Sequence, residues 1–196
     1  MMRSFFAVFT LVFAMFLAHI AVAQDIGETQ TNWAVDKTAS SIAFSGVQTG
    51  EKFTGSFADF DVQINFNPDD LANAKVVVTI DLASADAGDK DRNGALPGKE
   101  WFFVKKFPTA KFETTGFKHL GGNKYETTGQ LTIRGAAKTV TLPFTLDINN
   151  GKAVMAGQLN LNRRDFNIGT GMWKDQDWVK HNVGVQVAIN AKIILK

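Results

Sequence analysis

The stretch that decides the fold is T-V-T-L-P-F-T-L-D-I, from Thr139 to Ile148. Apolar residues occupy every second position, and threonine or aspartate fills most of the positions between them. Successive side chains of a β-strand point to opposite faces of a sheet, so the pattern predicts a strand with one dry and one wet face. Pro143 lies on the wet face. Because proline has no N–H to give to a ladder, it indicates a sheet edge or an irregularity there.

Most of the chain after residue 32 repeats this alternation, and short turn segments such as Asn67 to Asp70, Gly121 to Asn123 and Asn149 to Gly151 separate the runs. A one-residue slip in parity between Phe57 and Phe60 predicts a β-bulge where the sheet curls. Eight or nine antiparallel strands are expected. We predict an all-β fold, an eight-stranded antiparallel up-and-down barrel of the lipocalin-like type, with a β-sandwich as the alternative. A barrel of about eight strands either fills with side chains or holds one small ligand.

One long insertion, Asp89 to Pro108, interrupts the strands. Its centre holds four consecutive apolar residues, Trp101 to Val104, which would cover most of the circumference of a helix. We expect a short helix around residues 97–106 that is tucked against the sheet and ends before Pro108. It could be a covering helix that closes one end of the core, which we favour, or the lid of an apolar cavity.

The first 23 residues are typical of a secretory signal peptide. Arg3 precedes an apolar run from Phe5 to Ile20, and Ala21-Val22-Ala23 is a small-residue cleavage signal. The run is short for a membrane span, so we predict cleavage between Ala23 and Gln24 and not an uncleaved anchor. Residues 24–196 then form one exported domain, and we expect a periplasmic location.

Composition argues against several classes of function. The formal net charge is +2, too small for the basic field of a nucleic-acid-binding protein. The chain has no cysteine, which excludes disulfides and thiolate metal sites. His119 and His181 lie far apart in the sequence and lack metal-ligand spacing, so we expect no metal and interpret each as a solvated or locally bonded histidine. No Gly-x-Ser-x-Gly elbow or phosphate loop is present, and we predict no enzyme and no resident cofactor.

The most unusual polar cluster is Asn162 to Gly169, which contains Arg163 and Arg164. In extended backbone the two side chains would point to opposite faces, so one would face inward. We favour an Arg–Asp pair that braces the barrel end. The alternative is a cationic mouth for an anionic head group, because guanidinium groups suit phosphate and carboxylate, with Arg134 and Trp173 as neighbours.

Motifs along the whole exported part resemble the YceI-like family of secreted, lipocalin-like polyisoprenoid-binding proteins. The resemblance rests on Trp33-x-Val35-Asp36 with Ser40-Ser41-x-Ala43-Phe44, Phe53-x-Gly55-x-Phe57-x-x-Phe60, Thr79-Ile80-Asp81, Trp101-Phe102, Lys106-Phe107-Pro108, Tyr125-x-x-x-Gly129-x-Leu131-Thr132-Ile133-x-Gly135 and Arg164-x-Phe166-x-Ile168. The histidines that many members carry are replaced here by Ser40, the His-free segment 46–52 and the segment 93–96. In this respect the chain is similar to a subgroup often encoded beside a membrane b-type cytochrome.

The resemblance implies a periplasmic carrier that holds a long apolar lipid, a polyisoprenoid or a quinone-like chain, inside its barrel. Small residues on the inward faces, Gly55, Gly129 and Gly157, could leave room for a tunnel or mark strand bends. The alternatives are a quinone-linked redox partner or stress-related enzyme acting with a membrane b-type cytochrome, and a dry barrel that acts through its surface. Whether the protein forms a homodimer stays open. The expected ligand-binding residues are Phe44, Phe53, Phe57, Trp101, Phe102, Phe112, Leu131, Phe144, Met155, Arg164, Phe166 and Trp173.

Overall fold

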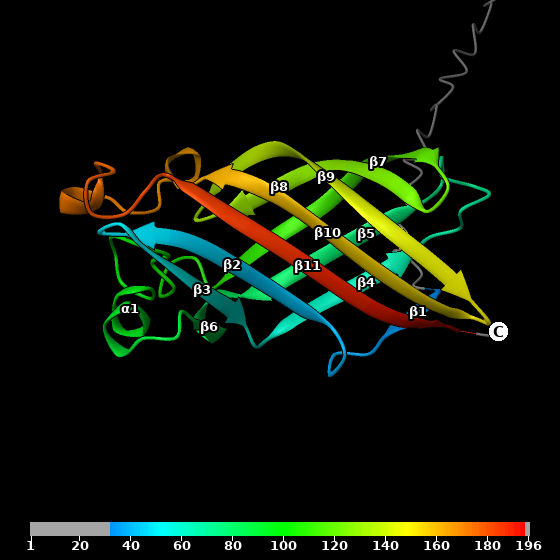
Figure 1. The fold of residues 1–196 in the computed structure, drawn as a ribbon, viewed down its shortest axis with the longest axis horizontal. Helices are drawn as coiled ribbons and strands as arrows, with labels where there is room; N and C mark the ends of the chain where they lie inside the picture. The colour runs from blue at the N-terminus through cyan, green and yellow to red at the C-terminus, as the bar shows by residue number, and fades with distance from the viewer. Residues whose placement is uncertain (1–31, 195–196) are drawn as a thin grey trace, which may run out of the picture.

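The computed structural model describes residues 32–194 (Figure 1). The predicted signal peptide and the Ala23–Gln24 cleavage site lie outside the described residues. The described elements are β1 (Trp33–Val35), β2 (Ser41–Gln48), β3 (Glu51–Phe57), β4 (Phe60–Asn65), β5 (Lys75–Asp81), η1 (Leu82–Ser84), β6 (Ala85–Asp86), α1 (Lys90–Ala95), β7 (Thr109–Gly121), β8 (Lys124–Ile133), β9 (Ala136–Asn149), β10 (Lys152–Asn162), η2 (Arg163–Phe166), η3 (Gly171–Trp173) and β11 (Asn182–Ile193).

The strands form one closed antiparallel barrel, as predicted from the alternation (Figure 1). Strands β1, β4, β5, β7, β8, β9, β10 and β11 make an eight-membered ring, which the β1–β11 pairing closes. Strands β2, β3 and β6 continue β1, β4 and β5 beyond short breaks, because β2 pairs with β11 and β3, and β3 pairs with β6. Eight long strands thus run up and down around the ring, three of them broken in two.

The break between β3 and β4 lies where the parity slip predicted a bulge. β3 ends at Phe57 and β4 begins at Phe60, so two residues stand outside both ladders. The His-free segment 46–52 is mostly strand: β2 continues through Gly46 to Gln48, and the chain turns at Thr49 and Gly50, both with positive φ. A two-residue turn with φ > 0 matches the twist of a tight hairpin.

The helix of the insertion is not at residues 97–106, where the sequence predicted it. It is α1, Lys90–Ala95, and the Asp89 side chain caps it by accepting hydrogen bonds from the N–H groups of Asp91 and Arg92. The residues after it form successive turns, with Phe103 at φ 53°. The helix therefore begins at the N-cap aspartate and not at the apolar run, and it ends early because Pro97 and Gly98 follow it at once.

Two buried clusters close the two ends of the barrel. At the end with the insertion, Phe102 packs with Leu82, Phe166 and Ile168. This arrangement agrees with the expectation that the apolar run of the insertion is tucked against the sheet. The cluster at the other end is built from Trp33, Phe66, Tyr125, Phe144, Ala153 and Ala191.

Candidate functional site

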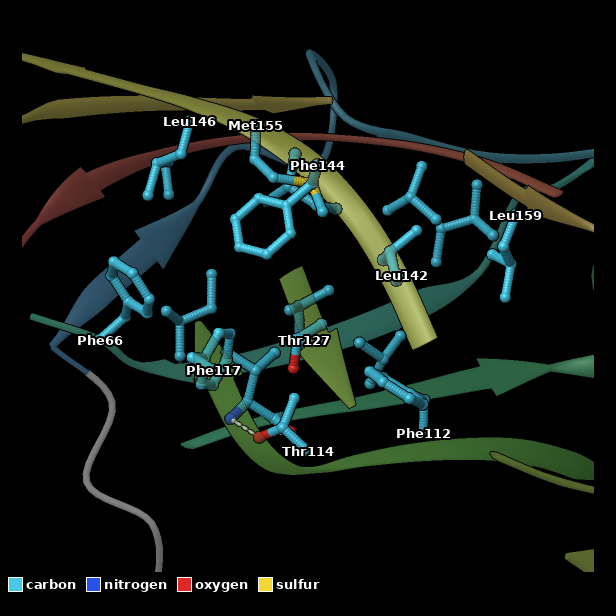
Figure 2. A pocket seen from close by; sticks show the side chains of 18 of the residues that line it. Phe66, Phe112, Thr114, Phe117, Thr127, Leu142, Phe144, Leu146, Met155 and Leu159 are labelled. Carbon is cyan, nitrogen blue, oxygen red and sulfur yellow. Dashed lines mark hydrogen bonds between the residues drawn. The ribbon is translucent and has the colours of Figure 1, made fainter. Parts of the chain in front are cut away.

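A cavity of about 170 Å³ lies inside the barrel, and we call it the central cavity (Figure 2). The alternation of the strands turns one apolar face of each toward it. Of the predicted ligand-binding residues, Phe112, Leu131, Phe144 and Met155 line it. The other lining residues are Trp33, Ile42, Val62, Ile64, Phe66, Val76, Val78, Ile80, Thr114, Phe117, Thr127, Val140, Leu142, Leu146, Ile148, Ala153, Leu159, Leu161, Val185, Val187, Ile189 and Ala191.

The central cavity has two hydroxyl groups in its lining, and the barrel wall uses both of them. Thr114 Oγ1 accepts a hydrogen bond from the Val76 N–H at 2.8 Å, and Figure 2 shows this bond. Thr127 Oγ1 donates to the Gly116 carbonyl at 2.9 Å. Since both hydroxyls are bound to the backbone, the cavity presents a hydrocarbon-like surface to whatever enters it.

A second cavity of about 300 Å³, the end cavity, lies beside the insertion. The predicted residues Phe44, Phe53, Phe57, Trp101, Phe102, Phe166 and Trp173 line it. It has a polar margin where Arg92 Nη1 donates to Gln48 Oε1 at 3.3 Å and the Arg92 guanidinium lies 4.9 Å from the Phe53 ring centre. Leu161 and Val185 line both cavities, so the two spaces adjoin there.

Glycines in the wall let aromatic rings lie flat against it. A Cβ on Gly55 would stand 2.4 Å from Phe44 Cζ, and a Cβ on Gly129 would stand 2.5 Å from Phe112 Cε2. Each ring therefore covers a glycine of the neighbouring strand, because Phe44 pairs with Gly55 in the β2–β3 ladder and β7 pairs with β8. Rings held against the wall do not reach across the barrel, and this helps to keep its middle open.

The arginine that faces inward is Arg163, and Arg164, which the sequence analysis placed in the site, lines neither cavity. Arg163 is 3% exposed, and its guanidinium donates to backbone carbonyls of the segment that follows it. The acceptors are the carbonyls of Ile168, Gly169, Trp173, Asp175, Val179 and Lys180, at 2.6–3.3 Å.

An Arg–Asp pair does not brace this end. The ion pairs found in residues 32–194 are Lys37–Asp61, Lys111–Glu113 and Lys118–Glu126, so Arg163 takes part in none of them. Parity could have identified the inward arginine. The inward series of β10 runs through Met155, Gly157, Leu159 and Leu161, and the next member is residue 163. The predicted Arg–Asp pair is therefore wrong, and the partners of the inward arginine are carbonyl groups of residues 168–180.

Two buried donors near the end cavity have no hydrogen-bond acceptor. They are Trp101 Nε1 and Arg134 Nη1, while Arg134 Nη2 donates to the Lys99 carbonyl at 2.7 Å. The Trp101 ring packs against Trp173, with 5.7 Å between ring centres, and against the Arg163 guanidinium. Burial lowers the pKa of Arg134 and Arg163, and the positive charge of Arg164 lowers both further. The guanidinium groups of Arg134 and Arg163 are therefore both close enough to Arg164 to feel its charge.

Other candidate chemistry is weak in the described part of the chain. His119 Nε2 is bonded to the Gly122 carbonyl at 2.8 Å and His181 Nε2 to the Lys174 carbonyl at 2.9 Å, so both histidines are locally bonded, as predicted. Within residues 32–194, three or more His, Asp or Glu side chains nowhere gather as metal ligands would. No helix in this range is long and apolar enough to cross a membrane.

The fold and the lining can now be compared with known proteins. A family model described as the YceI-like domain matches residues 33–193. The chain belongs to this family. The YceI-like domain thus spans the whole barrel, from β1 to β11, and includes every residue that lines the two cavities.

Relatives in this family support the assignment in sequence and in structure. A UPF0312 protein of Photorhabdus laumondii is 42% identical over 103 residues, and one of Yersinia pestis is 36% identical over 124 residues. These matches cover 53% and 60% of this chain, which spans 53% and 64% of those proteins. The crystal structure of BcnA from Burkholderia cenocepacia matches 81% of this chain and all of that one, with a TM-score of 0.78 and 38% identity.

A more distant structure shares the fold alone. It is a polyisoprenoid-binding domain from Saccharophagus degradans, implicated in plant cell wall breakdown, which matches with a TM-score of 0.68. The match covers 84% of this chain and 99% of that domain, at 14% identity. A barrel of this shape is therefore compatible with very different sequences.

Proposed function

We propose that the protein is a periplasmic carrier that holds a long apolar lipid, a polyisoprenoid or a quinone-type chain, inside its barrel. The observation that carries this proposal is the central cavity, an interior space whose lining is apolar except for Thr114 and Thr127. Both hydroxyls are already bonded to the wall. Such a lining suits a hydrocarbon chain and offers little to a polar substrate.

The volumes favour a chain that extends through both cavities. The central and end cavities have about 170 and 300 Å³, so a ligand that filled both would occupy about 470 Å³. Small-molecule sites commonly measure about 300–1,000 Å³, so the two spaces together are large enough for one ligand. Each buried CH₂ contributes roughly 0.8 kcal/mol, and a chain of a few isoprene units could bind tightly through its tail alone.

The comparisons and the sequence support the remaining parts of the proposal. A domain of the same fold is described as polyisoprenoid-binding, which supports a lipid cargo in this barrel as well. The predicted signal peptide at residues 1–23 supports a periplasmic location. With a quinone cargo, the proposed redox partner is a membrane b-type cytochrome. Binding and not catalysis is proposed, because both histidines are engaged with backbone carbonyl groups, His119 with that of Gly122 and His181 with that of Lys174.

The test is lipid recovery followed by binding measurements. The protein purified from its native host is extracted with organic solvent, and the extract is analysed by mass spectrometry. In parallel, a benzoquinone with two isoprene units is titrated against the protein, and its quenching of tryptophan fluorescence gives the affinity. We expect recovery of a prenyl lipid and saturable binding. Repeated extraction of no lipid, together with no quenching by the quinone, would contradict the proposal.

A matched pair of variants on β10 tests whether the bound lipid chain lies in the central cavity. Met155 lines the central cavity, while its neighbour Val154 is 49% exposed on the outer face. Met155→Trp fills the cavity and is expected to weaken quinone binding by about tenfold or more, roughly 1.4 kcal/mol. Val154→Trp adds the same side chain outside the barrel and should leave the affinity unchanged.

A further inference from the structure

Strands β9 and β10 are neighbours in the ring that are only partly paired, as are β1 and β4, which pair at Trp33 and Ile64 alone. We call the unpaired part of β9 and β10 the seam. The β9–β10 ladder runs from Asn149 and Lys152 to Phe144 and Gly157 and ends there. Residues 136–143 of β9 and 158–162 of β10 have no partner across the seam among the described ladders. Their other sides are paired, since β9 pairs with β8 along residues 136–145 and β10 pairs with β11 up to Asn162.

The inner side of the seam is lined by aliphatic side chains. Val140 and Leu142 come from β9, Leu159 and Leu161 come from β10, and all four line the central cavity. Figure 2 shows Leu142 and Leu159 beside this cavity. The outward residues Thr141 and Asn160 are exposed. Side-chain packing, and not a hydrogen-bonded ladder, therefore separates the central cavity from the outside along this part of the wall.

The seam begins where β9 and β10 separate, next to Pro143 and Gly157. A Cβ on Gly157 would lie 3.0 Å from the Pro143 carbonyl oxygen and 3.1 Å from Leu142 Cδ1, so β9 approaches β10 closely at this glycine. The next residue of β9 beyond the ladder is Pro143, which has no N–H to extend it. On the outer surface, a hollow of about 690 Å³ includes Pro143, Gly157 and Gln158 in its lining. The hollow thus lies over the point where the two strands part.

The two ends of the barrel are held by buried hydrogen bonds, whereas the described ladders have no bond across the seam. At the end with the insertion, the Arg163 guanidinium holds the segment 168–180 by hydrogen bonds to its carbonyls. At the other end, Phe66 packs edge-on against Tyr125, and Trp33 Nε1 donates to the Phe66 carbonyl at 2.9 Å. Opening either end would break buried hydrogen bonds, at roughly 1–3 kcal/mol for each group left without a partner. Parting the seam breaks none of the ladder bonds.

We propose that the seam between β9 and β10 is a lateral portal through which the apolar chain enters and leaves the barrel. This inference rests on the proposed function, since it concerns the route to the same cavity. The apolar chain of the lipid passes from the outer hollow between Leu142 and Leu159, whose side chains rotate away. It then extends along the central cavity. The two strands stay joined by their ladder from Phe144 to Asn149.

The experiment joins the seam covalently. The chain has no cysteine, so two introduced cysteines are the sole thiols. Thr141→Cys with Asn160→Cys places one thiol on each side of the seam, both on exposed positions. The control is Thr145→Cys with Ala156→Cys, which are partners inside the intact ladder and are also exposed. Each pair is cross-linked with a short bis-maleimide, and stopped-flow quenching by the two-isoprene benzoquinone gives the association and dissociation rates.

Cross-linking the seam should slow both rates by at least about tenfold with little change in affinity, whereas the cross-linked control should stay within about twofold of the wild type. Wild-type rates in the cross-linked seam variant would overturn the portal and indicate entry through an end. Absence of quinone binding in every variant, the wild type included, would refute the proposed function itself.

A second pair of variants tests the portal without a cross-link. Leu159→Ala removes bulk at the seam, and Leu146→Ala makes the same change at a cavity-lining position inside the ladder, opposite Met155. The portal predicts a larger acceleration of uptake and release for Leu159→Ala than for Leu146→Ala. Equal acceleration in both variants would mean that the cavity volume, and not the seam, controls the rates, and would count against the portal.

Discussion

Replacing Arg163 with methionine should destabilise the barrel more than any other single arginine substitution at this end. The arginine is 3% exposed and donates to carbonyls spread over residues 168–180, three of them at 2.8 Å or less: those of Ile168, Trp173 and Val179. Methionine keeps the apolar stem of the side chain but removes every donor. The Trp173 and Val179 carbonyls are then left buried without their partner, while the Ile168 carbonyl keeps one hydrogen bond, from Arg164 Nη1.

The magnitude follows from the three short bonds. Hydrogen bonds to a charged group contribute roughly 1.5–3 kcal/mol each, so three of them correspond to about 5–9 kcal/mol before the segment relaxes. Water that reaches the freed carbonyls returns part of this, and a net loss of about 3–5 kcal/mol is expected, as when a buried charged partnership is broken. In a domain of this size the melting temperature should fall by roughly 6–20 °C.

Urea unfolding followed by tryptophan fluorescence measures the change, because the transition midpoint and its slope together give the free energy of unfolding. The matched control is Arg164→Met. Arg164 is half-buried, and its Nη1 donates to the Ile168 and Gly169 carbonyls. We expect this control to lose about 1 kcal/mol. A loss below about 1 kcal/mol in Arg163→Met, or a larger loss in Arg164→Met, would refute the assignment of Arg163 as the main brace.

Two further predictions concern the wall and the buried donors. Gly129→Ala should cost about 1–3 kcal/mol in urea unfolding, because its Cβ would lie 2.5 Å from the Glu113 carbonyl and from the Phe112 ring. Gly116→Ala, where a Cβ meets open space, should cost nothing, and equal losses would contradict the packing argument. Trp101→Phe removes a donor that has no acceptor, whereas Trp33→Phe removes one bonded to the Phe66 carbonyl. Trp33→Phe should therefore be the more destabilising by about 1–3 kcal/mol, and the reverse order would show that Trp101 Nε1 is satisfied.

Much of the fold could be predicted from local patterns. The period of two in Thr139 to Ile148 and in similar runs predicted the strands and one dry face for each, and the structure places Phe112, Leu131, Phe144 and Met155 in the cavity lining. Pro143 indicated an irregularity, and the β9–β10 ladder ends beside it. These features depend on covalent geometry and on residues near each other in the chain, so they can be read without coordinates.

Two predictions differed from the structure, the position of the helix in the insertion and the choice of the inward arginine. The helix was placed on the apolar run at Trp101, but the Asp89 cap starts it earlier and Pro97 with Gly98 follow it. Arg164 was chosen for the site although the parity of β10 leads to Arg163. The backbone leaves the extended conformation at η2, Arg163–Phe166, so alternation holds up to Arg163 and fails after it. Local conformation, and not residue type, decided both outcomes.

The sequence by itself determined that the protein is built of antiparallel strands that each have one apolar face, because side-chain alternation is a property of each strand alone. The tertiary structure decided that β1 meets β11, that rings resting on Gly55 and Gly129 help to keep the middle hollow, and that Arg163 finds its acceptors beyond η2. It also decided where the β9–β10 ladder stops. Each of these depends on the distance between atoms from different strands or loops, and a periodic pattern within one strand does not encode that distance.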